Sequence, residues 1–316
     1  MSTTTGSTRQ MPSPKRTATA AVLLAAVAYL CQLPGSADAS FPGRNGLIAF
    51  RSDRRFGGFE LWVVPSGGGQ VRRLKAPGWS ARWSPRGRRL VAIGQVPGGG
   101  EVYVVNADGR RLKRLTRTRV SESYPTWSPD GRWILFVSAE RRRGNLDLYK
   151  MRPNGSGRRR LASTPFCETA PAWSPDGTRI AFLNACVPGN TRWPLYVMRS
   201  DGTGVERLPS GGLGGPSWSP DSRQIALDDG LRIIVLNSDG SNVHVLTSGT
   251  EPAWSPDGQE IAFSRLVTGL CEPWNRMSRI LAIRTDGTGE RVVTPLGSRT
   301  WCDPDDYSPD WQPLPG

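Results

Sequence analysis

The residue types that most often catalyse reactions are scarce in this chain of 316 residues. Histidine, the commonest general acid or base, occurs once, as His244. The sequence has no Gly-x-Ser-x-Gly pattern for a serine nucleophile. One histidine and cysteines that we expect to be oxidised also make a zinc site a poor fit. The chain is therefore predicted to have no catalytic residue, no metal site and no cofactor, and to be no enzyme.

Carboxylates are the one catalytic alternative that the sequence leaves open. Asp303, Asp305 and Asp306 lie close together near the C-terminus, where they would suit calcium, although a solvated acidic loop explains them better. A carboxylate-dependent glycoside hydrolase or lyase also stays open, because the separation between loops cannot be read from the sequence.

Aromatic and basic side chains supply the candidate binding residues. Four tryptophans lie outside the repeat described below, and they either anchor a ligand or pack beneath disulfides: Trp79, Trp193, Trp274 and Trp301. Arginines far outnumber lysines, and a run of three, Arg141, Arg142 and Arg143, is suited to anionic polymers or lipids. No nucleic-acid partner is predicted, because the basic strands lack interleaved stacking residues.

An internal repeat organises the chain and positions the candidate binding residues. Trp-Ser-Pro begins at Trp83, Trp127, Trp173, Trp218 and Trp254, and an altered copy, Trp-Gln-Pro, begins at Trp311. The spacing of 36 to 57 residues suits a blade of four β-strands. We expect each of these six tryptophans to fill the space between neighbouring sheets.

Two Asp-Gly turns recur in each copy and connect short apolar strands. In Ser128-Pro129-Asp130-Gly131, proline presets φ and glycine supplies the positive φ of the turn. Two copies depart from this pattern: Arg86 replaces the aspartate, and Ser222 replaces the glycine. If Ser222 has a positive φ, Ser222→Gly should be neutral or stabilising.

The two ends of the chain are complementary. Leu47 to Phe50 matches the second strand of a blade without a Trp-Ser-Pro before it, and Trp311 begins a first strand with no second strand after it. Pairing of the N-terminal strand with the Trp311 strand would complete a sixth blade and remove open sheet edges. The predicted fold class is thus an all-β, six-bladed β-propeller over residues 40–316, expected to be a monomer.

The blade topology separates two faces. The short turns, between the first and second and the third and fourth strands, lie on one face, which we call the turn face. The longer, variable connections lie on the other, the loop face, and since variable loops usually carry function we expect the binding site there. The cysteines that follow residue 39 all lie in these loops, and of three pairings we favour Cys167 with Cys186 and Cys271 with Cys302.

The repeat resembles the TolB-type β-propellers, whose WD40-like unit has the same Trp-Ser-Pro-Asp-Gly, Ile-Ala-Phe and Asp-Gly sequence of elements. The resemblance covers about residues 41–313. It implies the propeller fold and the theme of protein binding in the periplasm. The family's namesake has a small α/β domain before its propeller. We expect that domain to be absent here, so a role in the Tol system is not implied.

The N-terminus has the pattern of an export signal. Lys15 and Arg16 precede an apolar stretch, and Ala37-Asp38-Ala39 fits a cleavage site after Ala39. Residues 1–39 are therefore predicted to be a signal peptide, with retention as an anchor as the alternative. Cleavage would remove three basic residues and one acidic residue, lower the net charge from +14 to +12, and leave no transmembrane segment.

Together these features predict a secreted, periplasmic or cell-surface propeller that binds a protein or scaffolds the cell envelope. The alternative is a lectin-like protein that binds cell-wall glycan or an anionic polymer. The minor alternative is the hydrolase or lyase described above.

Overall fold

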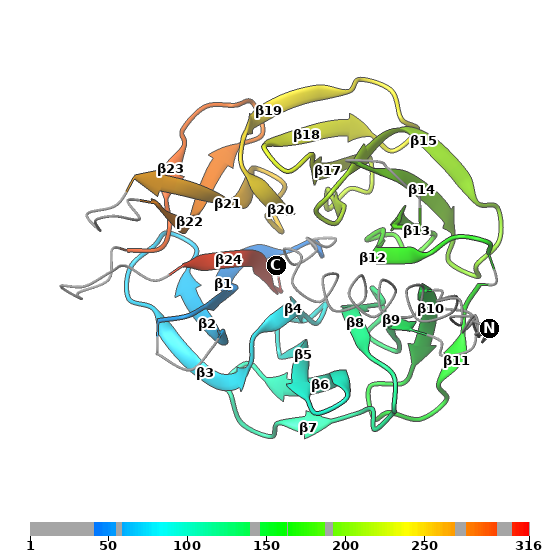
Figure 1. Ribbon diagram of the computed structural model, residues 1–316. Helices are drawn as coiled ribbons and strands as arrows, with labels where there is room; N and C mark the ends of the chain where they lie inside the picture. Colours follow the sequence, from blue (N-terminus) through cyan, green and yellow to red (C-terminus); the bar gives the residue numbers. More distant parts are fainter. Residues whose placement is uncertain are drawn as a thin grey trace, which may run out of the picture. The chain divides into compact units, whose positions relative to one another are not determined.

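The computed structural model describes residues 41–54, 59–139, 146–162, 164–186, 192–268, 276–295 and 305–315. The chain divides into two units, Met1–Leu33 and Pro34–Gly316, and all of the described residues belong to the second. This second unit is a β-propeller, with six sheets of four strands each arranged around a common centre (Figure 1).

We number the six sheets as blades in chain order and give their strands from the centre outward. Blade 1 contains β24 (Asp306–Leu314), β1 (Arg44–Ser52), β2 (Glu60–Pro65) and β3 (Arg72–Pro77). Blade 2 contains β4 (Trp79–Trp83), β5 (Arg89–Val96), β6 (Gly99–Asn106) and β7 (Lys113–Arg114). Blade 3 contains β8 (Glu122–Trp127), β9 (Ile134–Ala139), β10 (Leu146–Met151) and β11 (Arg159–Arg160).

The remaining blades follow the same order. Blade 4 contains β12 (Glu168–Trp173), β13 (Arg179–Asn184), β14 (Trp193–Arg199) and β15 (Glu206–Gly212). Blade 5 contains β16 (Ser217–Trp218), β17 (Gln224–Asp228), β18 (Arg232–Asn237) and β19 (His244–Ser248). Blade 6 contains β20 (Thr250–Trp254), β21 (Glu260–Thr268), β22 (Arg276–Arg284) and β23 (Arg291–Val292).

Blade 1 joins strands from the two ends of the chain. β1 pairs antiparallel with β24, and Ile48 lies opposite Trp311 in the register. The innermost strand of this blade therefore comes from the C-terminal part of the chain, and the other three come from the N-terminal part.

In blades 2 to 6 the turn between the first and second strands is held by its own serine. In blade 3, Ser128 Oγ donates to Asp130 Oδ1 at 2.5 Å and accepts from the backbone N–H of Trp133 at 2.9 Å. The turns of blades 4, 5 and 6 repeat both hydrogen bonds. Ser222 of blade 5 has φ of 62°, so a non-glycine residue does occupy the positive-φ position there.

The repeated tryptophans are buried in the structure, with at most 5% of any side chain exposed. Trp127 packs with residues of both blade 2 and blade 3, among them Val102 and Phe136. Trp311 lies between blades 6 and 1, where its Nε1–H donates to the carbonyl of Ala253 at 3.0 Å. The core is therefore a set of layers between neighbouring sheets.

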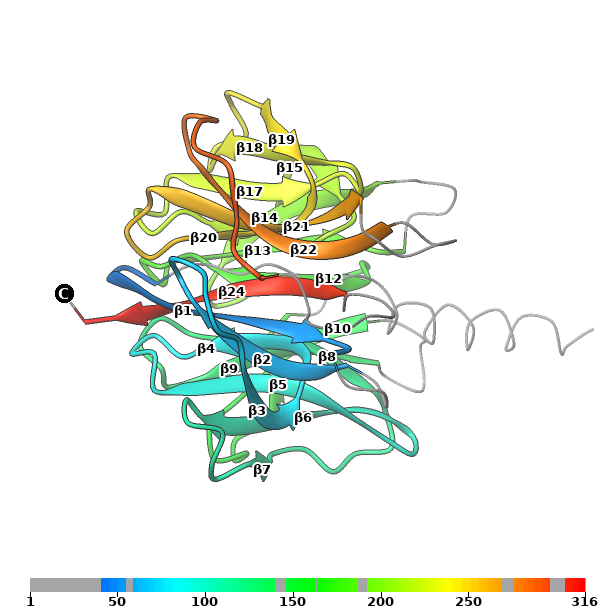
Figure 2. The same cartoon turned by 90° about the vertical axis from the view of Figure 1, so that its left-hand side faces the viewer.

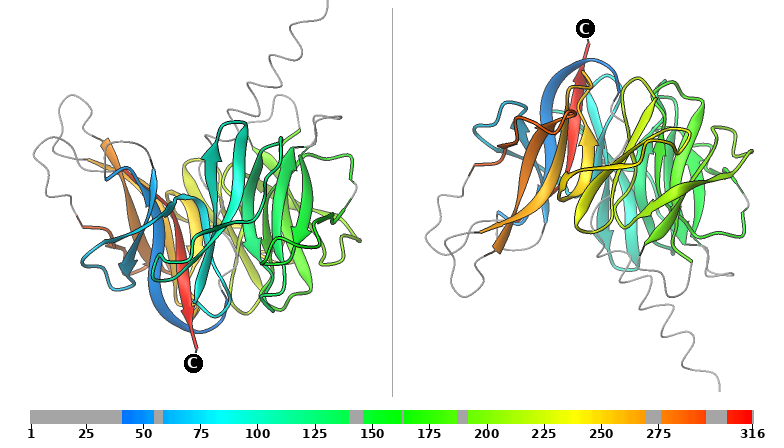
Figure 3. Two further views of the ribbon diagram at one scale, coloured as in Figure 1. Left: turned by 90° about the horizontal axis from the view of Figure 1, so that it is seen from below. Right: turned by 90° about the horizontal axis from the view of Figure 1, so that it is seen from above.

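The strands of each blade run between the two faces of the propeller (Figure 2). β24 reaches the turn face at its C-terminal end, where Leu314 and Pro315 lie beside the first turns of blades 2 and 3. Both views in Figure 3 show the described C-terminus extending from that face.

Candidate functional site

Most of the predicted loop-face residues lie outside the described residues. These are Trp274, Trp301, Arg141, Arg142, Arg143, Cys271, Cys302 and Asp303. Trp193 is half-buried at the start of β14, where it pairs with Gly212 of β15. The loop-face binding site therefore remains a prediction.

Trp79 packs against the protein's own side chains. The guanidinium of Arg51 lies 4.8 Å from the Trp79 ring centre, and it lies 4.9 Å from the rings of Phe59 and Tyr307. Phe59 also meets Trp79 edge-on at 5.7 Å. Arg51 is only 6% exposed, so these three rings enclose a buried cation. The ring of Trp79 is therefore in contact with Arg51 in the structure.

Among the described residues, Cys167 and Cys186 form a disulfide. Both backbone N–H groups, of Cys167 and of Cys186, donate to the side-chain oxygen of Asn184 at 3.1 Å. The bond links the connection that enters β12 with the connection that leaves β13, as the favoured pairing of these two cysteines predicted.

Asp305 and Asp306, near the C-terminus, interact with other residues of the protein. Asp306 is fully buried, and Arg54 donates to its carboxylate at 2.5 Å. Asp305 accepts from the backbone N–H of Ser278 at 2.7 Å. Burial raises the pKa of both carboxyl groups. The described residues contain no group of three histidine, cysteine or acidic residues that could hold a metal ion.

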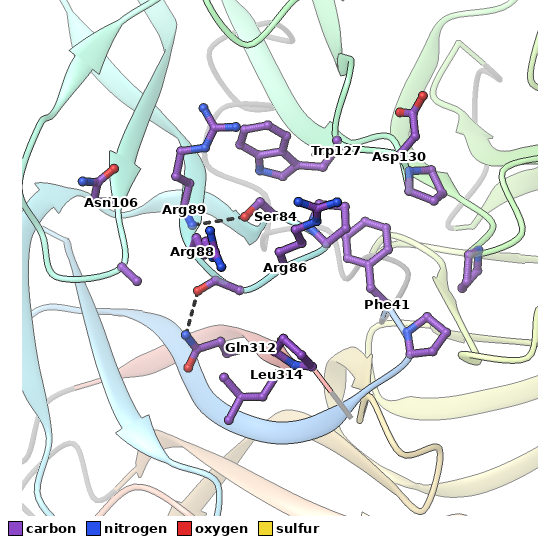
Figure 4. Close-up of a pocket in the computed structure, with 18 of the residues that line it drawn as sticks. Phe41, Ser84, Arg86, Arg88, Arg89, Asn106, Trp127, Asp130, Gln312 and Leu314 are labelled. Atoms are coloured by element: carbon purple, nitrogen blue, oxygen red, sulfur yellow. Dashed lines mark hydrogen bonds between the residues drawn. The ribbon is translucent and has the colours of Figure 1, made fainter.

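A large groove lies on the turn face, opposite the predicted site. It has a volume of about 1240 Å³ and we call it the turn-face groove (Figure 4). It is lined by the first turns of blades 2 and 3, the second turn of blade 2, Pro175 of blade 4, and residues from both ends of the propeller. Figure 4 labels Phe41 from the N-terminal end and Gln312 and Leu314 from the C-terminal end.

Three arginines from one turn line this groove: Arg86, Arg88 and Arg89. Arg89 is half-buried, and its guanidinium lies 4.9 Å from the ring centre of Trp127. Arg86 and Arg88 are exposed, and neither side chain has a carboxylate within ion-pair distance among the described residues. The groove therefore presents two uncompensated cations, while Arg89 covers the buried ring of Trp127.

The turn that carries these arginines is rigid. Gly87 has φ of +62°, and a Cβ placed there would lie 2.4 Å from the carbonyl oxygen of Pro313. Gln312 Nε2 donates to the carbonyl of Gly87 at 2.7 Å, and its Oε1 accepts from the backbone N–H of Leu47 at 3.0 Å. Arg86 thus stands on a backbone fixed by both ends of the propeller.

The two carboxylates that line the groove accept hydrogen bonds from residues of their own turns. Asp130 accepts from Ser128 Oγ at 2.5 Å and from the backbone N–H of Arg132 at 2.9 Å. Asp108 accepts from the backbone N–H of Arg110 at 2.8 Å. Both are exposed side chains that stabilise turns, a role that the equivalent aspartates of other blades share.

A third carboxylate, Asp310, is buried in β24. Its Oδ2 accepts from the backbone N–H of Trp83 at 2.7 Å. Burial raises the pKa of Asp310 to about 7, although the nearby Arg82 opposes that shift. Asp310 therefore links blade 1 to blade 2 and is sensitive to pH near neutrality.

His244 lies exposed on β19 at the outer edge of blade 5, and its Nδ1 is 3.0 Å from the carbonyl of Asn242. It is remote in the fold from the turn-face groove, which blades 1 to 4 line. None of the described residues forms a helix of the length and apolar character needed to cross a membrane.

Sequence reasoning noted Arg86 as a departure from the repeat but did not place it in a site. Arg88, Arg89 and Phe41 were not singled out. The available signal was Arg86 itself, because an arginine at that position supplies none of the turn hydrogen bonds that aspartate makes in four other blades.

A family model for the TolB β-propeller domain matches residues 69–226, which is half of the chain. The chain belongs to the TolB β-propeller family. The matched segment starts before blade 2 and ends within β17 of blade 5, so it includes the arginine-bearing turn of the groove.

Relatives of this TolB-family chain match it only in part. An uncharacterised protein of Agrobacterium fabrum is 30% identical over 106 residues, which is 33% of this chain and 36% of that protein. The chain thus matches only about a third of that relative's length.

Solved structures share the fold at low sequence identity. TolB from Acinetobacter baumannii has a TM-score of 0.69 and 19% identity, covering 93% of this chain and 72% of that chain. A chain of a nidogen/laminin complex has a TM-score of 0.63 and 12% identity, covering 84% of this chain and 98% of that chain. An oligogalacturonate lyase in complex with manganese has a TM-score of 0.50 and 14% identity, covering 83% and 76%. The fold therefore occurs both in a protein assembly and in an enzyme.

Proposed function

We propose that this protein is an exported, non-enzymatic propeller of the cell envelope or exterior that binds an acidic segment of a partner protein in the turn-face groove. Arg86 carries the proposal. It replaces the aspartate that stabilises the same turn in blades 3 to 6, and it lies exposed in the groove without an acidic partner among the described residues. A residue that breaks a local structural rule without local gain points to function.

The rest of the groove supports a protein ligand. Arginine is enriched at the centres of protein interfaces, and here Arg86 and Arg88 are exposed in a groove whose lining includes the buried residues Phe41 and Trp127. The turn is fixed by Gly87 and Gln312, so little conformational entropy would be lost on binding. Membership of the TolB family and the occurrence of the fold in a nidogen/laminin complex agree with a binding role.

The absence of catalysis is part of the proposal. Asp108 and Asp130, the groove carboxylates that could act as acid or base, are held by the hydrogen bonds of their own turns. The lyase of the same fold keeps the enzymatic alternative testable.

Site-specific photocrosslinking on the native cell surface tests the proposal. The crosslinking residue is placed at Arg88, at the equivalent exposed Arg223 of blade 5, or at the exposed Leu266 of the loop face. We expect one protein to be captured from position 88 and not from position 223. Capture from position 266 alone would instead support the site predicted from the sequence.

The captured partner then provides the affinity measurement. Arg86→Asp restores the common turn and should weaken binding by about tenfold or more, while the fold is retained. Arg223→Asp makes the same charge change at blade 5 and should leave the affinity within about twofold. Binding that is unchanged by Arg86→Asp, or capture of glycan and no protein, would contradict the proposal.

A further inference from the structure

Three cations converge on one indole at the outer part of blade 3. Trp133 follows the first turn of this blade and is half-buried. The ring centre of Trp133 lies 4.2 Å from the guanidinium carbon of Arg152, 5.3 Å from that of Arg159 and 5.4 Å from Lys150 Nζ. These residues belong to β10, β11 and the turn between them, apart from the turn-face groove.

Two of these cations face each other across a strand pair. Lys150 lies opposite Arg159 in the antiparallel register of β10 and β11. Like charges directly opposite each other destabilise a sheet. Burial lowers the pKa of Lys150, and Arg159 lowers it further, while Asp201 of blade 4 raises it.

Carboxylates do not neutralise the cluster. Among the described residues, no carboxylate lies within 4.0 Å of Lys150, Arg152 or Arg159. The neighbouring arginine differs, because Arg160 donates to Asp147 at 2.5 Å. The Trp133 ring is neutral, so its cation–π contacts, of about 0.5–1 kcal/mol each at exposed sites, do not change the net charge of the cluster.

Blade 3 departs from the other blades at two positions to build this cluster. The strand register aligns Lys150 with an apolar residue in each of the other five blades: Val63, Val104, Val197, Val235 and Ala282. The same register aligns Trp133 with a polar residue in four of them: Arg89, Arg179, Gln224 and Glu260. A common blade therefore needs neither the lysine nor the indole.

We propose that Lys150, Arg152 and Arg159 bind the phosphate group of an anionic ligand, with Trp133 holding the three side chains together. Guanidinium groups bind phosphate oxygens through paired hydrogen bonds, and lysine adds a compact charge. A phosphate monoester carries about −1.5 to −2 at neutral pH, so it compensates more of this cluster than one carboxylate does. The site is independent of the proposed protein partner.

Binding of tripolyphosphate to the purified protein, measured by calorimetry at low and at physiological salt, tests this site. Lys150→Val installs the residue type of the other blades and should keep the fold while weakening binding by about tenfold. Arg159→Gln should weaken it similarly. Arg110→Gln removes an exposed charge from the neighbouring blade and should change the affinity by less than about twofold.

Three outcomes would overturn the proposal. In the first, wild-type protein binds tripolyphosphate no better than Lys150→Val does. In the second, Arg110→Gln weakens binding as much as Arg159→Gln does, and in the third, Lys150→Val changes the melting temperature but not the affinity for tripolyphosphate. A second measurement identifies the source of the phosphate. Cosedimentation with phosphatidylglycerol vesicles that tripolyphosphate displaces and that Lys150→Val abolishes indicates a lipid headgroup. Tripolyphosphate binding without cosedimentation indicates a free phosphate compound.

Discussion

Two grooves of the turn face are built from equivalent turns but contain side chains of opposite charge. The larger, between blades 1 to 4, contains Arg86, Arg88 and Arg89. The smaller, of about 430 Å³ at blades 5 and 6, contains Asp221 and Asp257 and is lined by no basic residue. A buried tryptophan lies at each, Trp127 in the first and Trp254 in the second.

This difference shows which positions the blade constrains. The first serine of the turn makes the same hydrogen bond to the backbone in both grooves, from Arg89 N to Ser84 Oγ at 3.1 Å and from Glu260 N to Ser255 Oγ at 2.9 Å. The residue two places after that serine differs, being Asp257 in blade 6 and Arg86 in blade 2. The serine bond to the backbone is thus kept in both turns, while the hydrogen bonds of the aspartate are given up in blade 2.

The largest expected effect concerns the buried tryptophan that lies at each of the two grooves. Trp127→Ala and Trp254→Ala should each lower the free energy of unfolding by about 3–5 kcal/mol, because each indole fills a layer between two sheets. Chemical denaturation measures both. Values that differ by much more than about 1 kcal/mol would show that the halves differ in core as well as in charge.

The next effect concerns the residue that differs. Asp257→Arg should destabilise the protein by about 1–3 kcal/mol, because Asp257 accepts from Ser255 Oγ, from Gln259 N–H and from Asn45 Nδ2. Arg86→Asp should have the opposite sign and stabilise by up to about 1 kcal/mol. Thermal melting of the two variants provides the comparison, and a destabilising Arg86→Asp would give Arg86 a structural role.

The third prediction concerns pH and the residues beneath each groove. Asp310 accepts from Trp83 N–H beside the larger groove, whereas Ser217 Oγ accepts from Trp254 N–H at 3.1 Å beside the smaller one. Because burial raises the pKa of Asp310 from 3.8 to about 7, the folded chain binds more protons than the unfolded chain between these values. This contribution to stability is therefore lost as the pH rises toward 7 and above.

Unfolding measured between pH 4 and pH 8 tests that assignment. Asp310→Asn keeps the acceptor for Trp83 N–H but cannot titrate, so the pH dependence should become shallower. Ser217→Ala should cost about 1 kcal/mol at every pH. An unchanged pH profile in Asp310→Asn would remove Asp310 from the titrating groups. Burial likewise raises the pKa of Glu122 and Glu168 to about 7, so part of the slope should persist.

The smallest expected effect lies in the turn of blade 5. Ser222→Gly relieves a positive φ of 62° but removes the hydrogen bond from Asp176 N–H to Ser222 Oγ at 3.0 Å. These contributions oppose each other, so the change should be within about 1 kcal/mol. The equivalent Gly87→Ser should destabilise clearly, since its Cβ would meet Pro313. Equal melting temperatures for the two variants would contradict this contrast.

The predictions made from sequence succeeded where neighbours in the chain decide the structure. The Trp-Ser-Pro repeat predicted the six blades, and the turn pattern predicted the positive φ of Ser222. The pairing of Cys167 with Cys186 also followed from their places in consecutive loops. Trp79 shows the limit, because the ring that we predicted to bind a ligand packs instead on Arg51, together with the rings of Phe59 and Tyr307.

The sequence by itself determined the blade, because serine, aspartate and glycine of one turn make hydrogen bonds to residues only two to five positions away. Tertiary structure alone brought Phe41, Arg86 and Gln312 into one groove. Those residues lie as far as 271 positions apart, and only the packing of the two chain ends against blade 2 makes them neighbours. Strand register, and not sequence proximity, likewise brings the charges of Lys150 and Arg159 together at the ring of Trp133.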